Sequence, residues 1–180
     1  TMRAVKFESR SKTEALVDKV HPFHGRPARL FRFSVPRLRE ASLQRTAEPR
    51  MEDDGTGMAT VLSGLLKRDR DAFARLEADL RAVVPQVRRV AIESAQVEAS
   101  SNAYGDLAAV DIEGVGRVTA PDLSEGTLLT LALLTELHRP GGADILLLDD
   151  LDRGLHPRAQ ADLLGCLRAL MTRRPALQVV

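Results

Sequence analysis

The sequence has very little cysteine and no long apolar run, and these two features exclude disulfide-rich, cysteine-metal and membrane-spanning classes of protein. Cys166 is the single cysteine among 180 residues, which excludes a disulfide framework and any zinc or iron–sulfur site built from several cysteines of the chain. The longest run of large aliphatic residues is Ile145–Leu148, whereas a bilayer span needs roughly 20 apolar residues. The first thirty residues lack the hydrophobic block of a secretory signal. We therefore expect a soluble, cytoplasmic protein without a membrane segment.

Neither sign of charge dominates the chain as a whole, but the two signs are unevenly placed. Lys and Arg number 26 against 25 Asp and Glu, a formal net charge of +1, which argues against a globally basic nucleic-acid coat and against an acidic solvating chain. Residues 1–50 carry 12 basic and 5 acidic side chains, whereas residues 51–180 carry 14 and 20. With 44% hydrophobic residues, the chain can bury one sizeable core and is one domain or most of one.

The basic excess is concentrated in a stretch between Lys19 and Arg39 that contains no acidic residue. Phe31 and Phe33 are interleaved with its arginines, and such a pattern can contact the phosphates of DNA or RNA. Alternation of period two also predicts a strand with both phenylalanines inward and the intervening arginine outward. Both interpretations stay open, and the candidate nucleic-acid contacts are Arg26, Arg29, Arg32 and Arg37.

The middle of the chain predicts a loop, a helical segment and an antiparallel β element. Residues 40–57 are polar and rich in turn formers, and residues 58–85 show helical spacing of apolar side chains that Pro85 ends. Short β-type runs follow at 87–92 and 107–112, and the second leads into a glycine-containing turn. We expect the helical segment to be an insertion into a larger fold.

The C-terminal third alternates helices and strands. A capped helix is predicted over 124–138, a buried strand over 145–148, a second helix beginning at His156 and Pro157, and a further strand from Ala176. Helix, strand, helix, strand is the order of a parallel sheet with covering helices. The expected fold class is therefore α/β, with the antiparallel element added to the parallel sheet.

The strand at 145–148 delivers two carboxylates, Asp149 and Asp150, to its carboxyl end. Open α/β sheets bind ligands at that end. In nucleotide enzymes Asp149 can hold Mg²⁺, and Asp150 can orient or deprotonate an attacking water. Taken alone, the same residues are also consistent with a strand that ends in an acidic loop.

Two flanking motifs favour the nucleotide interpretation. Leu-Ser-Glu-Gly-Thr occupies 123–127, and Leu-Asp-Arg-Gly-Leu-His-Pro occupies 151–157. In this order the three elements resemble the ABC-type ATPase head of the RecF, SMC and overcoming-lysogenization-defect group, over about residues 105–180 and more loosely before. The resemblance implies that residues 1–180 are the C-terminal portion of one P-loop NTPase head. Residues 120–180 would supply its signature helix, Walker B strand and following helix.

The resemblance also assigns roles to the first motif. Ser124 and Gly126 stand at signature positions that contact the γ-phosphate of ATP bound to a second protomer, while Glu125 replaces a glycine. A helix N-terminus favours an anion, and glycine lets phosphate approach the backbone closely. Ser124 can also be an ordinary helix cap, and Glu125 would repel phosphate unless it pointed away or met a cation.

By the same resemblance Asp149 is the Walker B carboxylate and Asp150 takes the place of the catalytic glutamate. Aspartate is one methylene shorter, and a misplacement of about 1 Å can cost about 10²-fold in rate, so slow turnover is expected. Asp152 and His156 fall in the loop that crosses the dimer interface of the family. His156 can also be the cap of the helix that starts at Pro157.

A phosphate-cradling loop is absent from this sequence. That loop needs the pattern G-x-x-x-x-G-K-[ST], and none of the four lysines follows a glycine: Lys6, Lys12, Lys19 and Lys67. We expect the missing half to precede Thr1, and the family's switch histidine to follow Val180. The chain alone is then expected to bind ATP weakly or not at all.

The predicted function is ATP binding and hydrolysis, with ATP and Mg²⁺ as cofactors and a homodimer that sandwiches ATP. DNA and a fused or separate nuclease or toxin are candidate further partners. The alternative is a non-catalytic, degenerate head that binds a partner or nucleic acid through its basic N-terminal region. A phosphate-binding loop upstream in the gene would favour the enzyme.

Overall fold

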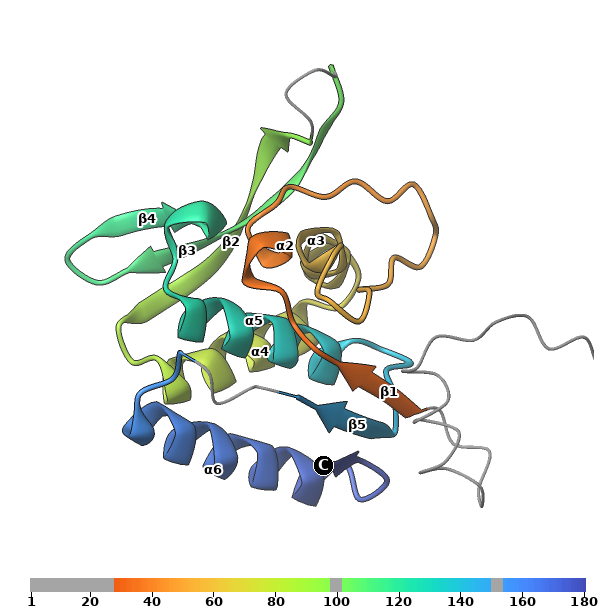
Figure 1. The fold of residues 1–180 in the computed structure, drawn as a ribbon, viewed down its shortest axis with the longest axis vertical. Coiled ribbons are helices and arrows are strands. Elements are labelled where there is room, and N and C mark those ends of the chain that lie inside the picture. Colours follow the sequence, from red (N-terminus) through yellow and green to blue (C-terminus); the bar gives the residue numbers. More distant parts are fainter. Residues whose placement is uncertain (1–27, 98–101, 150–153) are drawn as a thin grey trace, which may run out of the picture.

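The computed structural model describes residues 28–97, 102–149 and 154–180. These residues form two three-stranded sheets and a set of helices that lie between and beside them (Figure 1). The combination of a parallel sheet, flanking helices and an antiparallel sheet confirms the predicted fold class. No helix in the described ranges is long and apolar enough to cross a membrane.

The parallel sheet has the order β1-β5-β6, with β5 in the centre. Its strands are β1 (Ala28–Phe31), β5 (Ile145–Leu148) and β6 (Gln178–Val179). Ala28 is in register with Ile145 and Phe31 with Leu148, so β1 and β5 end at the same edge. Phe31 is buried at the end of β1, and Phe33 lies beyond the strand with its ring centroid 5.1 Å from that of Phe31.

The antiparallel sheet has the order β2-β3-β4. Its strands are β2 (Val87–Gln96), β3 (Tyr104–Ile112) and β4 (Gly116–Thr119). The β2 and β3 strands both extend beyond the predicted runs, and the hairpin that they form projects from the body of the molecule (Figure 1). Ser42 pairs with Asp106 of β3 through an isolated antiparallel bridge. Gly105 permits this contact, because a Cβ at that position would lie 2.4 Å from the Ser42 carbonyl oxygen.

The predicted helical segment at 58–85 contains two helices that meet at Asp69. They are α3 (Met58–Arg68) and α4 (Arg70–Val83), and the Asp69 side chain caps α4 by accepting from the Ala72 N–H at 2.8 Å. A cap residue inside the helical pattern explains the break, since aspartate competes for backbone N–H groups. The loop before α3 carries one further short helix, α2 (Val35–Leu38).

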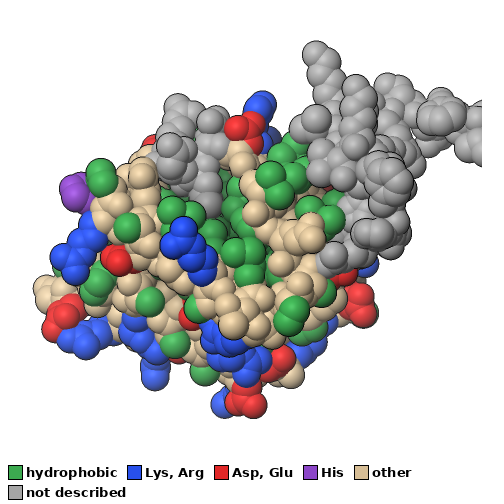
Figure 2. Space-filling model, turned by 90° about the horizontal axis from the view of Figure 1, so that it is seen from below, with side chains coloured by type: hydrophobic (Ala, Val, Ile, Leu, Met, Phe, Trp, Pro, Cys, Tyr) green, Lys and Arg blue, Asp and Glu red, His purple; other side chains and the backbone are tan. Residues whose placement is uncertain are grey.

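The helix α5 (Glu125–His138) is the centre of the core. Every residue from Gly126 to Leu137 is buried, as expected for a helix that is apolar on all sides. α4 packs against both α5 and the C-terminal helix α6 (Pro157–Arg173), whose buried face is apolar. Seen from below, apolar side chains show in the middle of the molecular face beside a basic side chain, and further charged side chains lie along its left and lower edges (Figure 2).

A charged cluster ties the ends of α4, α5 and α6 together. The His138 Nε2 lies 2.8 Å from Asp79 Oδ2, and Arg173 reaches the same carboxylate at 3.4 Å. Burial raises the pKa of Asp79, but the His138 hydrogen bond and the charges of His138 and Arg173 outweigh it, so the pKa is lowered. Burial raises the pKa of the neighbouring Cys166 thiol to about 11, which keeps it protonated and unreactive at neutral pH.

The Asp79 cluster predicts an acid-sensitive contribution to stability. Because the folded-state pKa of Asp79 is lowered, its contribution is present above the unfolded-state pKa of about 3.9 and is lost as pH falls through the folded-state value. We expect Asp79→Asn to lower the free energy of unfolding at pH 7 by about 1 kcal/mol, with little difference from the wild type at low pH. Urea unfolding at several pH values measures this. An equal deficit at every pH would contradict it.

Candidate functional site

The carboxyl edge of the parallel sheet brings Asp149 beside the end of β1. The Asp149 N–H donates to the Phe31 carbonyl oxygen at 3.0 Å, which continues the ladder one residue past the end of β5. On the β1 side, Arg32 Nε donates to Asp149 Oδ2 at 2.8 Å, and Arg32 Nη2 donates to the same oxygen. The Asp149 side chain is 38% exposed and that of Arg32 is 75% exposed. A ligand arriving at this edge therefore meets an accessible ion pair.

The signature-like turn opens helix α5. Ser124 is the N-cap: its Oγ accepts from the Thr127 N–H at 3.2 Å and lies 2.8 Å from Thr127 Oγ1. The Ser124 side chain is nevertheless exposed, so the capping role leaves it accessible. The first N–H groups of a helix have no partner within the helix, and the helix dipole favours an anion beside them.

Gly126 is in close contact with the loop that follows β5. A Cβ on Gly126 would lie 2.8 Å from the Gly154 carbonyl oxygen and 2.8 Å from Leu155 Cδ2. Gly154 has a φ of +79°, and a Cβ there would lie 3.0 Å from Glu125 Cβ. The two glycines thus let the turn at 124–126 and the loop at 154–156 touch through their backbones.

One cavity of about 500 Å³ joins these two segments. Ser124, Gly126 and His156 all line it, and the turn between α4 and β2 forms another of its walls. His156 is the N-cap of α6, with Nδ1 3.4 Å from the Arg158 nitrogen, and its side chain is exposed. The structure therefore brings together three predicted site residues that are up to 32 positions apart in the sequence.

Glu125 belongs to a second cavity, of about 390 Å³, on another side of the same turn. Arg32, residues 33–36 at the start of α2, and Leu129 line that cavity with it. Glu125 is not among the residues that line the larger cavity with Ser124 and Gly126. Glu125 therefore shares a cavity with Arg32 and not with Ser124 and Gly126.

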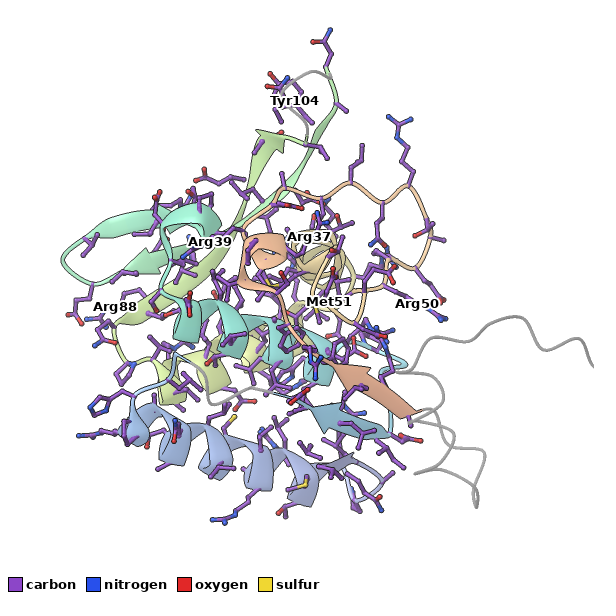
Figure 3. All side chains as sticks on the ribbon, in the orientation of Figure 1. Arg37, Arg39, Arg50, Met51, Arg88 and Tyr104 are labelled. Atoms are coloured by element: carbon purple, nitrogen blue, oxygen red, sulfur yellow. The ribbon has the colours of Figure 1, made fainter. Side chains whose placement is uncertain are left out.

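Three predicted site residues lie outside the described residues: Asp150, Asp152 and Arg26. The other three candidate nucleic-acid contacts, Arg29, Arg32 and Arg37, each pair with a carboxylate. Arg29 pairs with Asp53 at 2.9 Å and with the buried Glu136 at 3.6 Å. Arg37, on α2, pairs with Glu40 at 3.1 Å (Figure 3). Nucleic-acid binding through this stretch stays a prediction.

Arg39 contacts the backbone beside the signature-like turn, and the sequence analysis did not predict this contact. It follows α2 (Figure 3), and its Nη2 donates to the Leu123 carbonyl oxygen at 3.3 Å, directly before Ser124. Among the described side chains, its Nε is a buried nitrogen without a hydrogen-bond partner. The approach of α2 to α5 depends on tertiary packing, and no sequence motif signals it.

The chemistry of the Asp149 edge fits Mg²⁺ held together with phosphate. No group of three or more His, Cys, Asp or Glu side chains able to hold a metal occurs in the described ranges, so those residues form no all-protein cage. Mg²⁺ usually takes one or two carboxylates and fills its other positions with water and phosphate oxygens. Among the described residues, Asp149 supplies the one carboxylate that such a Mg²⁺ site needs.

Residues 5–180 match the family model described as "AAA domain, putative AbiEii toxin, Type IV TA system". No curated protein matches the chain.

Proposed function

We propose that this chain, which belongs to the AAA domain family named above, is part of an ABC-type ATPase head that binds and hydrolyses ATP between two protomers. The family supports a nucleotide-binding, ATPase-like function in general terms. The proposal is more specific: it places the chain in the RecF, SMC and overcoming-lysogenization-defect group. Residues 1–180 then form the C-terminal portion of the head, and residues 58–85 are a helical insertion.

The cavity that joins Ser124, Gly126 and His156 is the observation that carries this proposal. The exposed Ser124 and two residues of the first turn of a 14-residue helix, Gly126 and Thr127, line one hollow, and a helix N-terminus attracts phosphate. In the proposed dimer, Ser124 and Gly126 contact the γ-phosphate of ATP held by the partner subunit. His156 and Asp152 then lie in the loop that crosses between the subunits.

Asp149 has the second role in the proposal. At the carboxyl edge of β5 it would hold Mg²⁺ for ATP bound to its own protomer. When bound, Mg²⁺ neutralises charge on the phosphate oxygens. Asp150, the next residue, would orient the attacking water or accept its proton. Because it is shorter than glutamate, slow turnover is part of the proposal.

Binding of ATP by the full-length protein tests the role of Asp149. We expect Asp149→Asn to raise the Kd for Mg·ATP about tenfold, the equivalent of about 1.4 kcal/mol, without changing the Kd for ATP in excess chelator. Asp144→Asn is the matched control, because Asp144 lies just before the other end of β5 and should leave both constants unchanged. Calorimetry measures both. A loss that is equal with and without Mg²⁺, or equal for the two variants, would refute the assignment.

A further inference from the structure

Arg32 occupies the carboxylate that the proposed function assigns to Mg²⁺. Two of its guanidinium nitrogens donate to Asp149 Oδ2, with Nε at 2.8 Å. The pair is fixed by the fold, because Phe31 and Leu148 are in register and each charged residue follows its strand directly. The metal carboxylate is therefore already neutralised by a cation of the same chain.

Arg32 and Mg²⁺ compete for this carboxylate. Both are cations, so Mg²⁺ on either oxygen of Asp149 is repelled by a guanidinium that stays within hydrogen-bond distance. The pair is exposed, at 75% for Arg32 and 38% for Asp149, and exposed ion pairs are worth roughly 0–1 kcal/mol. Such a pair is weak enough to open when Mg²⁺ arrives with a nucleotide.

Glu125 offers the released arginine a second partner. Arg32 and Glu125 line the same cavity of about 390 Å³. Glu125 also lies beside the loop after β5, since its Oε2 would be 3.3 Å from a Cβ placed on Gly154. No ion pair of Glu125 occurs among the described residues. A long, exposed arginine side chain can therefore exchange one carboxylate for the other within this cavity.

We propose that Arg32 is a positioning residue that alternates between Asp149 before Mg·nucleotide binds and Glu125 afterwards. This inference rests on the proposed function. It also gives a role to Glu125, which replaces a glycine of the signature motif. The exchange links the proposed Mg²⁺ site of one protomer, at Asp149, to the helix turn at 124–126 that serves the opposite protomer.

A double-mutant cycle on the Mg²⁺ requirement tests the exchange. In the full-length protein, the Mg²⁺ concentration that gives half-maximal binding of a fluorescent ATP analogue is measured without following hydrolysis. Arg32→Gln should lower it about three- to fivefold, since the competitor is gone. Glu125→Gln should raise it about two- to threefold, since the carboxylate charge that attracts the released arginine is gone. In the Arg32→Gln background, Glu125→Gln should change nothing.

Arg88→Gln is the matched control, because Arg88 forms an exposed pair with Glu113 at 60% and 59% exposure on the antiparallel sheet (Figure 3). It should leave the Mg²⁺ requirement unchanged. An unchanged or higher requirement in Arg32→Gln overturns the proposed competition. Equal effects of Glu125→Gln in both backgrounds overturn the exchange. If Asp149→Asn itself leaves the wild-type Mg²⁺ dependence intact, the proposed function fails and this inference falls with it.

Discussion

Asp149→Asn and Ser124→Arg should each abolish ATP hydrolysis alone, and mixing the two variant proteins should restore about a quarter of wild-type turnover. The first substitution removes the charge proposed to hold Mg²⁺. The second puts a long side chain into the cavity of about 500 Å³ that Ser124 and Gly126 line. Each loss should exceed about 10²-fold, because both interactions stabilise the transferring phosphoryl group.

The recovered quarter follows from the composite arrangement. In the proposed dimer each ATP meets Asp149 of one subunit and Ser124 of the other. A mixed dimer therefore has one site with both defects and one site with neither. Random association of equal amounts makes about half of all dimers mixed, and each of these keeps one site of two.

The readouts must separate rescue from misfolding and from cooperativity. Unfolding temperatures of both variants, and a tagged pull-down that shows mixed dimers, serve as controls. Trapping of a nucleotide analogue reports the intact site even where strict cooperativity suppresses turnover. If mixed dimers form but neither hydrolysis nor trapping returns, Ser124 is only the cap of α5 and the signature assignment is wrong.

Sequence patterns predicted that Asp149 ends a buried strand and that Ser124 starts a helix, because both features depend on local rules. Four aliphatic residues before Asp149 indicate a buried strand, and the serine three residues before Thr127 indicates a helix start. The break at Asp69 shows the limit of such rules. Helical periodicity continues through it, whereas the observed chain ends one helix and caps the next.

Contacts between distant segments could not be predicted in this way. Arg32 and Asp149 are 117 positions apart, and their pairing depends on the register of two parallel strands. The side on which Glu125 lies relative to Ser124 depends on how the loop at 154–156 packs on the helix turn. The sequence alone indicates that the Glu125 carboxylate would repel a nearby phosphate. The fold instead places Glu125 in the cavity that Arg32 lines.

The contact between Gly126 and the loop after β5 yields a second large expected effect, because it makes two helical glycines respond oppositely to the same change. Gly165→Ala in α6 meets nothing within 4 Å, so it should raise the free energy of unfolding by about 0.5–1 kcal/mol through helix propensity. Gly126→Ala places a Cβ 2.8 Å from the Gly154 carbonyl oxygen. A backbone atom cannot rotate away, and overpacking of this kind costs about 1–3 kcal/mol.

Gly126→Ala should therefore lower the free energy of unfolding and also reduce ATP hydrolysis, since the turn at 124–126 must move away from the loop at 154–156. Chemical denaturation of both variants measures the first effect, and turnover normalised to folded protein measures the second. Gly165→Ala should keep wild-type turnover. Stabilisation by Gly126→Ala similar to that by Gly165→Ala would mean that the loop yields freely. In that case the contact with Gly154 would not position the helix turn, and Gly126 would matter only where phosphate approaches it.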